Sequence, residues 1–591
     1  MKPPGNKGAP PGPPEPDLFT APVSPNNERL MRVDGDKGLS LVEKLTAGLH
    51  RLSYGTALHR SRLRGRFPLK LLAVPTDPIP GDRATGERIV AGRLPHAGYN
   101  PPSRSVRFDD PAAPAAWRDW ANSFAWLRDL AAATDRKTGA AITEPIVARW
   151  LAAHGEFDAV TWRPDLLGQR ILFCTAYAPY VLSSVDLVYH SAVLNALARW
   201  ARHIDRAIEN LPDGMPRVTA AAGLVVAGLL IPGGEARLSR AERLLDRALA
   251  SVLAADGGVA DRSPLTQLAL LELLLFVQAT YLARGRRPLP ELAAAMTRLV
   301  PALKFMVMGD GGFGAWHGGG VARPERIEHA VKLSGVMARP SRQGNFSGYQ
   351  RLVGGKTLVV VDAGPPPEAR AAIAAHAGTL AFELSDNVHL IVVNCGTGGL
   401  LPRPLPVELT EALRTTAAHS TLILSDSNST RIRPDGALGK GVEEVTTNRQ
   451  ESEEGGWLDL AHDGYVRRFG VVHRRRLFLS ADGNDLRGED LLEPAPGRRL
   501  RRRGASAGFD IRFHLGVGVE AIPTGEGHGA ILKLPDGHAW QVRVRGGKLM
   551  IDDSLWIDHD GVPRTTRQLV VSGTTTASGA ASVNWSFKRA G

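Results

Sequence analysis

The spacing of apolar residues changes once along this chain, and that change limits the folds the chain can adopt. From about residue 39 to residue 300, apolar side chains recur at intervals of three and four, as in Leu194, Leu197, Ala201, Ile204 and Ile208. This spacing places them on one face of an α-helix. After the glycine-rich stretch GDGGFGAWHGGG (309–320), apolar residues fall in short alternating or β-branched runs. The sequence therefore predicts a helical part followed by a β part.

Further helical faces recur in the first part, and short breaks rich in Gly and Pro separate them. The faces lie around 117–130, 220–230, 241–253, 264–282 and 289–306, with breaks at 211–216, 231–234 and 255–258. Gly and Pro stop helices, and helices joined by short turns pack as antiparallel hairpins. We expect stacked helical hairpins here.

The second part carries many short strand-like runs with turn dipeptides between them. Examples are TLVVVDAG, TLAFELS, VHLIVVNCG, STLILSD, FGVVHRRRLFLS, AWQVRVRGGKLMID and RQLVVSG, punctuated by pairs such as Asp482-Gly483 and Asp536-Gly537. Strands at this spacing, with hardly a helix between them, are typical of stacked antiparallel sheets. An order of all helix and then all strand indicates separate domains, not an interleaved α/β sheet.

Length and composition agree with more than one domain. At 591 residues, 43% hydrophobic and 22% charged, the chain exceeds the size at which one core stops growing. Residues 1–38 begin with a proline-rich stretch that lacks the apolar segment of a secretory signal, so we expect a disordered leader. The most apolar run, LALLELLLFV (268–277), is too short to cross a bilayer and predicts a buried helix. No transmembrane segment is expected.

Charge and cysteine usage restrict the partners and cofactors. Lys and Arg number 72 against 60 Asp and Glu, a formal charge of +12. That excess suits a polyanion, or it reflects a solvated, arginine-rich surface. The runs HRRR (473–476) and RRLRRRG (498–504) are typical of a solvated edge. Cys174 and Cys395 lie too far apart in sequence for a disulfide framework or a four-thiolate zinc site. Motifs for nucleotides, metalloproteases, serine hydrolases and nucleic acids are missing from the sequence.

The β part resembles the C-terminal sandwich of the heparinase II/III-like family. The resemblance rests on HAGTLAFELS (376–385), VVNCG (392–396), TTAAHSTLILSDSNST (415–430), 464–492 and IRFHLGVGV (511–519). It extends upstream through NFSGYQRLVGG (345–355), the 309–320 loop and DGGVADRSP (256–264), and so covers about 186–573. It implies an incomplete α/α toroid at 39–335 followed by an antiparallel β-sandwich at 336–591.

The resemblance also implies a reaction. Family members of known activity cleave acidic polysaccharides, heparin and alginate among them, by β-elimination. That reaction needs a group that neutralises the uronate carboxylate, a base for the proton beside it, and an acid such as Tyr or His for the leaving oxygen. Arg suits the first task because it binds carboxylates in a bidentate fashion. The implied partner is an acidic glycan, and the implied location is the cell envelope or periplasm, with the cytoplasm as the alternative because no signal peptide is seen.

The family's His-x-His-x-Asp cluster is carried over only in part. Its second His matches His376, whereas its first His is Ala374 here and its Asp is Gly378. In some relatives this second His joins an Asp and a later His around a structural zinc, at positions that match Asn394 and His419. Asn offers a weak, neutral oxygen donor, which counts against zinc. His376 is thus a candidate base or zinc ligand, and a buried core His is the alternative.

In the helical part the usual acid and base positions hold other residues. The family's Asn/His pair at the start of a cleft-facing helix is matched by Met215-Pro216-Arg217, and its Tyr by Thr266. Arg217 and Arg262, at loop-to-helix junctions, are candidates to bind a uronate carboxylate, with ordinary surface arginines as the alternative.

Two further candidates lie near the expected domain junction. Tyr349 is the phenol nearest to that junction and is a candidate acid, with a core aromatic as the alternative. In the 309–320 loop, Trp316 and His317 could stack on a sugar, or the loop is a plain linker.

Three functions remain open on the sequence. The first is a lyase that acts on an acidic glycan, and the second is a binding or scaffold protein with the same architecture and no chemistry. The third, a glycoside hydrolase, needs a pair of carboxylates beside the cleft, and no such pair stands out.

Overall fold

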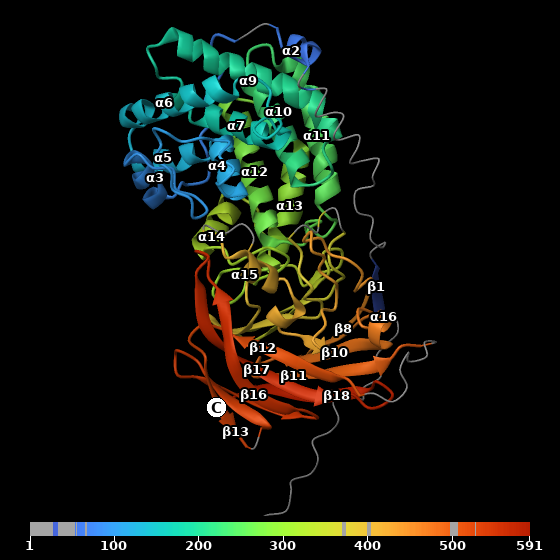
Figure 1. Cartoon of the computed structure of the whole chain (residues 1–591). Helices are drawn as coiled ribbons and strands as arrows, with labels where there is room; N and C mark the ends of the chain where they lie inside the picture. Colours follow the sequence, from blue (N-terminus) through green and yellow to red (C-terminus); the bar gives the residue numbers. More distant parts are fainter. Residues whose placement is uncertain are drawn as a thin grey trace, which may run out of the picture.

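The computed structural model describes residues 28–32, 54, 56–65, 68–368, 371, 374–398, 403–496, 506–525 and 527–590. Helices form one end of the molecule and two antiparallel sheets the other (Figure 1). The helices are α2 (Ala57–Arg62), α3 (Arg83–Val90), α4 (Ala115–Ser123), α5 (Trp126–Ala133), α6 (Arg136–His154), α7 (Pro164–Ala176), α8 (Ala178–Val181), α9 (Leu187–Ala207), α10 (Met215–Leu230), α11 (Glu235–Val252), α12 (Pro264–Ala283), α13 (Pro290–Phe305) and α14 (Pro324–Leu333), with a 3-10 turn, η3 (Ile208–Asn210). The expected order of a helical toroid and then a β-sandwich is confirmed.

Helix α10 lies at the centre of the helical half. Every side chain from Val218 to Leu230 is buried, and the helix contacts α7, α9, α11 and α12. Gly223 and Gly168 allow α10 and α7 to touch backbone to backbone, because a Cβ added at Gly223 would lie 2.4 Å from the Gly168 Cα. The position of α10 therefore depends on small residues at its crossing with α7.

The apolar run at 268–277 forms part of the core. Among the described residues, α12 is the helix long and apolar enough to span a membrane by length and composition. Its apolar side chains instead pack in the helical core, and its Glu272 pairs with Arg326 of α14 at 2.7 Å.

The helical face expected at 117–130 is divided between two helices. Helix α4 ends at Ser123 and is capped by Phe124, whose φ of 64° is left-handed, and α5 begins at Trp126. Phe124 is fully buried against Trp150 and Trp200. Packing of this ring outweighs the cost of the left-handed backbone, a contribution that periodicity does not reveal.

Two sheets form the sandwich. The first has the order β1-β8-β9-β10-β11-β18-β15-β14-β13, and the second has the order β16-β17-β12-β6-β5-β4-β3-β2 with β7 paired to β12. The strands are β1 (Glu28–Arg32), β2 (Gln343–Gly344), β3 (Tyr349–Gly354), β4 (Thr357–Asp362), β5 (Phe382–Asp386), β6 (His389–Val393), β7 (Leu422–Leu424), β8 (Glu444–Glu451), β9 (Gly455–His462), β10 (Val471–Ser480), β11 (Asp485–Pro494), β12 (Gly508–Leu515), β13 (Glu520–Thr524), β14 (Gly529–Lys533), β15 (Ala539–Arg545), β16 (Lys548–Ile557), β17 (Pro563–Thr574) and β18 (Ala581–Arg589). Short helices α15 (Val407–Ala412) and α16 (Val466–Phe469) and the 3-10 turn η4 (Thr416–Ala418) lie in connections.

Strand β1 lies within the segment that was expected to be a disordered leader, so that expectation is wrong for this part of it. Residues 28–32 were expected in a disordered leader of 1–38, yet they form β1 and pair with β8 from Glu28↔Asn448 to Arg32↔Glu444. The rest of that leader lies outside the described residues. The sandwich thus takes an edge strand from before the helical half.

The basic run 473–476 is only half solvated. It lies on β10, where Arg474 and Arg476 face outward while His473 and Arg475 are fully buried. Asp490 accepts hydrogen bonds from Arg475 and contacts His473 at 2.8 Å. Strand alternation turns every second charge into the core, where a carboxylate neutralises it. The run 498–504 lies outside the described residues.

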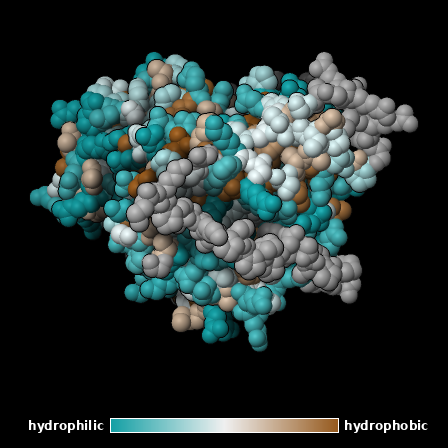
Figure 2. All heavy atoms as spheres, turned by 90° about the horizontal axis from the view of Figure 1, so that it is seen from below, coloured by the Kyte–Doolittle hydropathy of each residue, from teal (hydrophilic) through white to brown (hydrophobic). Residues whose placement is uncertain are grey.

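Hydrophilic residues cover most of the sandwich end of the molecule seen from below, and apolar residues show mainly near the middle of that view (Figure 2). The interior between the sheets is apolar, with Phe382, Phe513 and Trp585 in mutual ring contact.

Candidate functional site at the junction of helices and sheets

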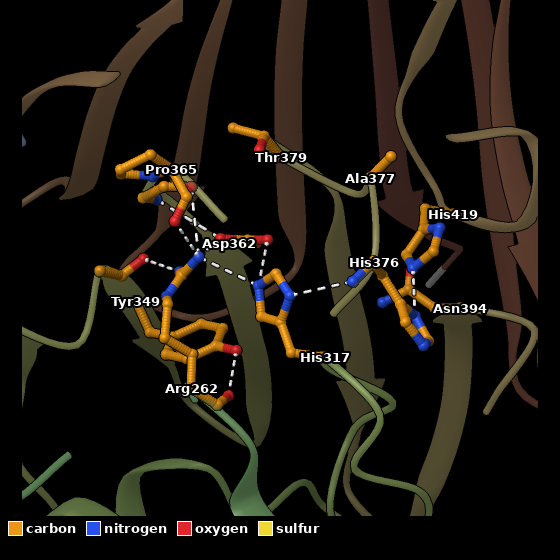
Figure 3. A network of polar contacts seen from close by, with 12 residues as sticks. Arg262, His317, Tyr349, Asp362, Pro365, His376, Ala377, Thr379, Asn394 and His419 are labelled. Carbon is orange, nitrogen blue, oxygen red and sulfur yellow. Dashed lines mark hydrogen bonds and ion pairs between the residues drawn. The ribbon is translucent and has the colours of Figure 1, made fainter. Parts of the chain in front are cut away.

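Arg262 joins the two halves of the molecule. It precedes α12 with a left-handed φ of 58°, and its side chain enters the β half. There it donates to Asp362 Oδ1 at 2.5 Å and to the carbonyl oxygens of Ser347 and Pro365 at 2.7 and 2.8 Å (Figure 3). The guanidinium also lies 4.6 Å from the Tyr349 ring centre. With 6% of the residue exposed, Arg262 has its hydrogen-bonding capacity committed to the protein.

Asp362, at the end of β4, contacts two side chains, the Arg262 guanidinium and the His317 ring. Besides Arg262, the His317 Nε2 atom lies 3.2 Å from Asp362 Oδ2. Burial alone would raise the pKa of Asp362, but the neighbouring Arg262 and His317 hold that pKa below its ordinary value. His317 Nδ1 accepts from the backbone N–H of His376 at 3.3 Å, and His317 Nε2 lies close both to Asp362 Oδ2 and, at 3.0 Å, to Arg262 Nη1.

His376 and His419 lie side by side, as the sequence comparison expected. His376 Nδ1 is 3.0 Å from His419 Nε2, and His419 Nδ1 is 2.7 Å from the Thr415 carbonyl. The carbonyl fixes a hydrogen on His419 Nδ1, so His376 Nδ1 donates to His419 Nε2. His376 Nε2 is then an unprotonated atom, and it is buried with no hydrogen-bond partner among the described residues.

Burial keeps both rings neutral. It lowers the pKa of His376 well below the usual value, and the charges of His419, His317 and Arg414 act in the same direction. Burial also lowers the pKa of His419 to about 4. The pair is therefore a neutral hydrogen-bonded unit at physiological pH.

The three expected zinc ligands do not fit a zinc ion in this arrangement. Asn394 Oδ1 accepts from the Ser420 N–H at 3.0 Å, and its amide nitrogen donates to Glu383 at 3.0 Å. The ring nitrogens of His376 and His419 that face each other are bonded together. Within the described part of the chain, no group of three His, Cys, Asp or Glu side chains is placed to hold a metal. A zinc needs three or four free donors around one point, and both atoms of the Asn394 amide are committed to other partners.

Tyr349 is a buried structural phenol. Its hydroxyl donates to the Arg262 carbonyl at 2.7 Å, and the residue is 2% exposed. Burial raises the pKa of Tyr349 well above its ordinary value. The hydroxyl proton therefore stays on Tyr349 and supports the junction.

Arg217 lies apart from this network. It is in the first turn of α10, pairs with Asp213 at 2.6 Å and donates to the Leu211 carbonyl. It lines a hollow of about 250 Å³ with Glu209 and Arg247. The structure thus brings His376, Asn394 and His419 together, joins Arg262 and Tyr349 to them through His317, and leaves Arg217 at a separate surface.

The residues at the centre of the network have no signature in the sequence. Asp362 ends the run VVVD, and only its contacts identify it as the partner of Arg262. Trp316 and His317, expected to be available to a sugar, are 1% and 4% exposed. Glu383 is also buried, accepts from the backbone N–H groups of Ala315 and Asn394, and has a pKa raised by burial to about 7. An acid inside the strand FELSD gives no such signal in sequence.

Comparison with known proteins agrees with this architecture. The family model "Heparinase II/III-like, C-terminal" matches residues 336–586. FtsZ-localized protein C of Caulobacter vibrioides is 31% identical over 555 residues, which span 91% of this chain and 93% of that protein. The chain belongs to the heparinase II/III-like family.

Solved structures show how far the heparinase II/III-like fold extends along the chain. The crystal structure of heparinase III has a TM-score of 0.69 with 12% identity and covers 95% of this chain and 93% of that one. The heparan sulfate lyase HepC of Pedobacter heparinus, in a mutant form, has a TM-score of 0.60 with 13% identity over 93% of this chain and 88% of that one. At these identities the likeness establishes the fold of both halves.

Proposed function

We propose that this heparinase II/III-like protein is a binding or scaffold protein of the cell-division site that retains the lyase fold without the elimination reaction. One observation carries the proposal: the groups expected to perform the chemistry at the junction are buried and bonded to one another. Arg262 and Tyr349 have their donors committed to protein acceptors, and His376 is 1% exposed. A lyase needs these groups free to meet a uronate.

The division site is inferred from the relative. A protein named for its localisation with FtsZ shares 31% identity with this chain over nearly the whole length of both. The formal charge of +12 supports an anionic partner, and an acidic glycan of the envelope is the partner that the fold favours.

A second candidate is elimination with His376 as the base. It is favoured by the His376 Nε2 atom, which carries a lone pair and has no hydrogen-bond partner among the described residues. The base would need the junction to open, since the ring is enclosed.

Product absorbance separates the two candidates. The protein is incubated with heparin, heparan sulfate and alginate, and the ultraviolet absorbance of the unsaturated product is followed, with the heparan sulfate lyase HepC on heparan sulfate as the positive control. We expect no absorbance above that of a His376→Ala variant. Absorbance that grows with protein concentration and disappears in His376→Ala would establish the lyase and overturn the binding proposal.

The division-site role is tested in cells. A fluorescent fusion of the full chain should form a band that coincides with labelled FtsZ, and His376→Ala and Tyr349→Phe should keep that band, because the role does not require chemistry. A diffuse signal in dividing cells, from a fusion that is intact on a gel, would contradict the proposal.

A further inference from the structure

A pocket of about 420 Å³ opens on the β half beside α15, and the carbonyl of its lining residue Thr415 is the hydrogen-bond partner of His419. Leu409, Leu413 and Leu555 supply apolar walls, and Cys395, His514 and Ser554 lie together at its polar side. Its volume lies in the range of about 300–1,000 Å³ that small-molecule sites occupy. An apolar pocket with a few converging polar groups is the usual form of such a site.

Three segments of the second sheet bring the polar groups together. His514 is near the end of β12, Cys395 follows β6, and Ser554 lies on the edge strand β16. His514 Nδ1 is 2.8 Å from Ser554 Oγ and 3.4 Å from Cys395 Sγ. Two hydrogen-bond donors therefore face one ring nitrogen.

The backbone fixes the tautomer of His514. Its Nε2 atom lies 2.9 Å from the Ala417 carbonyl, which can only accept, so the ring hydrogen is on Nε2 and the lone pair is on Nδ1. Burial lowers the pKa of His514 to about 3, so the ring is neutral throughout the physiological range and is a weak base until a bound ligand changes its surroundings. This is the arrangement of a nucleophile, a base and a group that orients the base.

Ser554 is a better nucleophile here than Cys395. The thiol is 5% exposed, and burial raises its pKa to about 12, so it remains protonated and unreactive. Ser554 is half-buried and lines the pocket. Its hydroxyl contacts the base, and the residue lines the space that a ligand would fill.

We propose that this pocket is an acyl-transfer site, in which Ser554 is the nucleophile and His514 the general base for esters of small apolar acyl groups. Ser554 Oγ bonds to the acyl carbonyl carbon while its proton passes to His514 Nδ1. The bond to the leaving alcohol oxygen breaks, and the Nδ1 proton passes to that oxygen. A water oxygen then bonds to the acyl carbon while His514 Nδ1 takes a water proton. The bond between the acyl carbon and Ser554 Oγ breaks, the Nδ1 proton returns to Oγ, and the carboxylic acid leaves.

The Ala417 carbonyl, which orients His514 but carries no charge, limits the expected rate of ester hydrolysis. A carboxylate stabilises the imidazolium that forms during such a reaction, whereas the Ala417 carbonyl orients the ring without adding a charge. We therefore expect slow turnover, visible with activated esters and with phosphonylating reagents. The apolar walls favour short alkyl chains over charged acyl groups.

Covalent labelling of the full chain tests the site. The protein is treated with an alkyl fluorophosphonate, and the modified residue is located by peptide mass spectrometry, alongside hydrolysis of p-nitrophenyl butyrate. We expect the label on Ser554, its loss in Ser554→Ala, and at least a tenfold slower reaction in His514→Gln, which keeps a donor for the Ala417 carbonyl but has no base. Ser572→Ala, which alters a serine on the neighbouring strand β17 that donates to Asp510, should label as the wild type does.

Two results would overturn the assignment. The first is labelling of the wild type no greater than that of Ser554→Ala, with equal melting temperatures of the two proteins. The second is a label that appears on Cys395 or elsewhere while Ser554 stays unmodified.

Discussion

At the scale of single residues, the junction shows how a buried charge becomes structural. Arg262 is taken from solvent and placed among carbonyl oxygens, and Asp362 supplies the compensating charge at 2.5 Å. Desolvation of two ions is costly, so removal of one partner leaves the other unpaired in the interior. The pair therefore specifies how the helical half meets the sheets.

Substitution of Asp362 tests that dependence. Asp362→Asn keeps the shape but removes the charge that Arg262 and His317 face, and we expect a loss of about 3–5 kcal/mol in the free energy of unfolding. Glu87→Gln, which breaks the exposed pair with Arg83 on α3, should have little or no effect. Urea denaturation followed by tryptophan fluorescence measures both, and equal midpoints for the two variants would contradict the assignment.

The candidate site could be predicted from sequence only in part. The likeness of His376 and His419 to family positions predicted their contact, because aligned positions share a fold. The partnership of Arg262 and Asp362 could not be predicted, because the two residues are 100 positions apart and each lies in an ordinary local context. Burial of Tyr349 and His317 is likewise a product of domain packing.

At the scale of helices and strands, the sequence predicted the type of each element better than the residues at which it begins and ends. The 3.6-residue period identified α11 and α13, which each bury one face, whereas α10 and α12 are apolar runs that are buried on most sides. The limits at Phe124 and the strand at 28–32 arise from tertiary contacts. ERLMR has little alternation of its own, and its pairing with β8 makes it a strand.

The crossing of α7 and α10 gives a prediction at this scale. Gly223→Ala would gain about 1 kcal/mol of helix propensity, yet its Cβ would meet the Gly168 backbone at 2.4 Å. Overpacking costs about 1–3 kcal/mol, and backbone cannot rotate away, so we expect a net loss of stability. Thr297→Ala, on the exposed face of α13, is the matched helix control. Urea unfolding followed by far-ultraviolet circular dichroism measures the stability of both variants. A Gly223→Ala variant more stable than wild type would contradict the close approach of α7 and α10.

At the scale of the whole molecule, buried neutral histidines connect stability to pH. Burial lowers the pKa of His96 to about 4 and the pKa values of His203 and His514 to about 3. In the unfolded chain each of these histidines has a pKa near 6.5. Below that pH the unfolded chain therefore binds protons that the folded chain does not bind. Their contribution is complete above pH 6.5 and is lost as the pH falls toward the folded values.

The resulting pH dependence has a predictable size. Each of these three histidines should cost about 1.4 kcal/mol at pH 5.5, or roughly 4 kcal/mol together, relative to pH 7.5. Urea midpoints at pH 7.5, 6.5 and 5.5 measure the loss, and His514→Gln should reduce the slope by one proton. A midpoint that stays constant between pH 7.5 and 5.5 would exclude this account.

The strand at 28–32 has a consequence for any attempt to divide this protein. A fragment that starts after α14 would contain the rest of the sandwich but would lack β1, the segment that covers β8. Its unpaired backbone amides and carbonyls would then be open to the same edge of another copy, which promotes self-association. Cutting between the halves thus removes a piece of the second half as well, and the two parts of the chain are best handled as one.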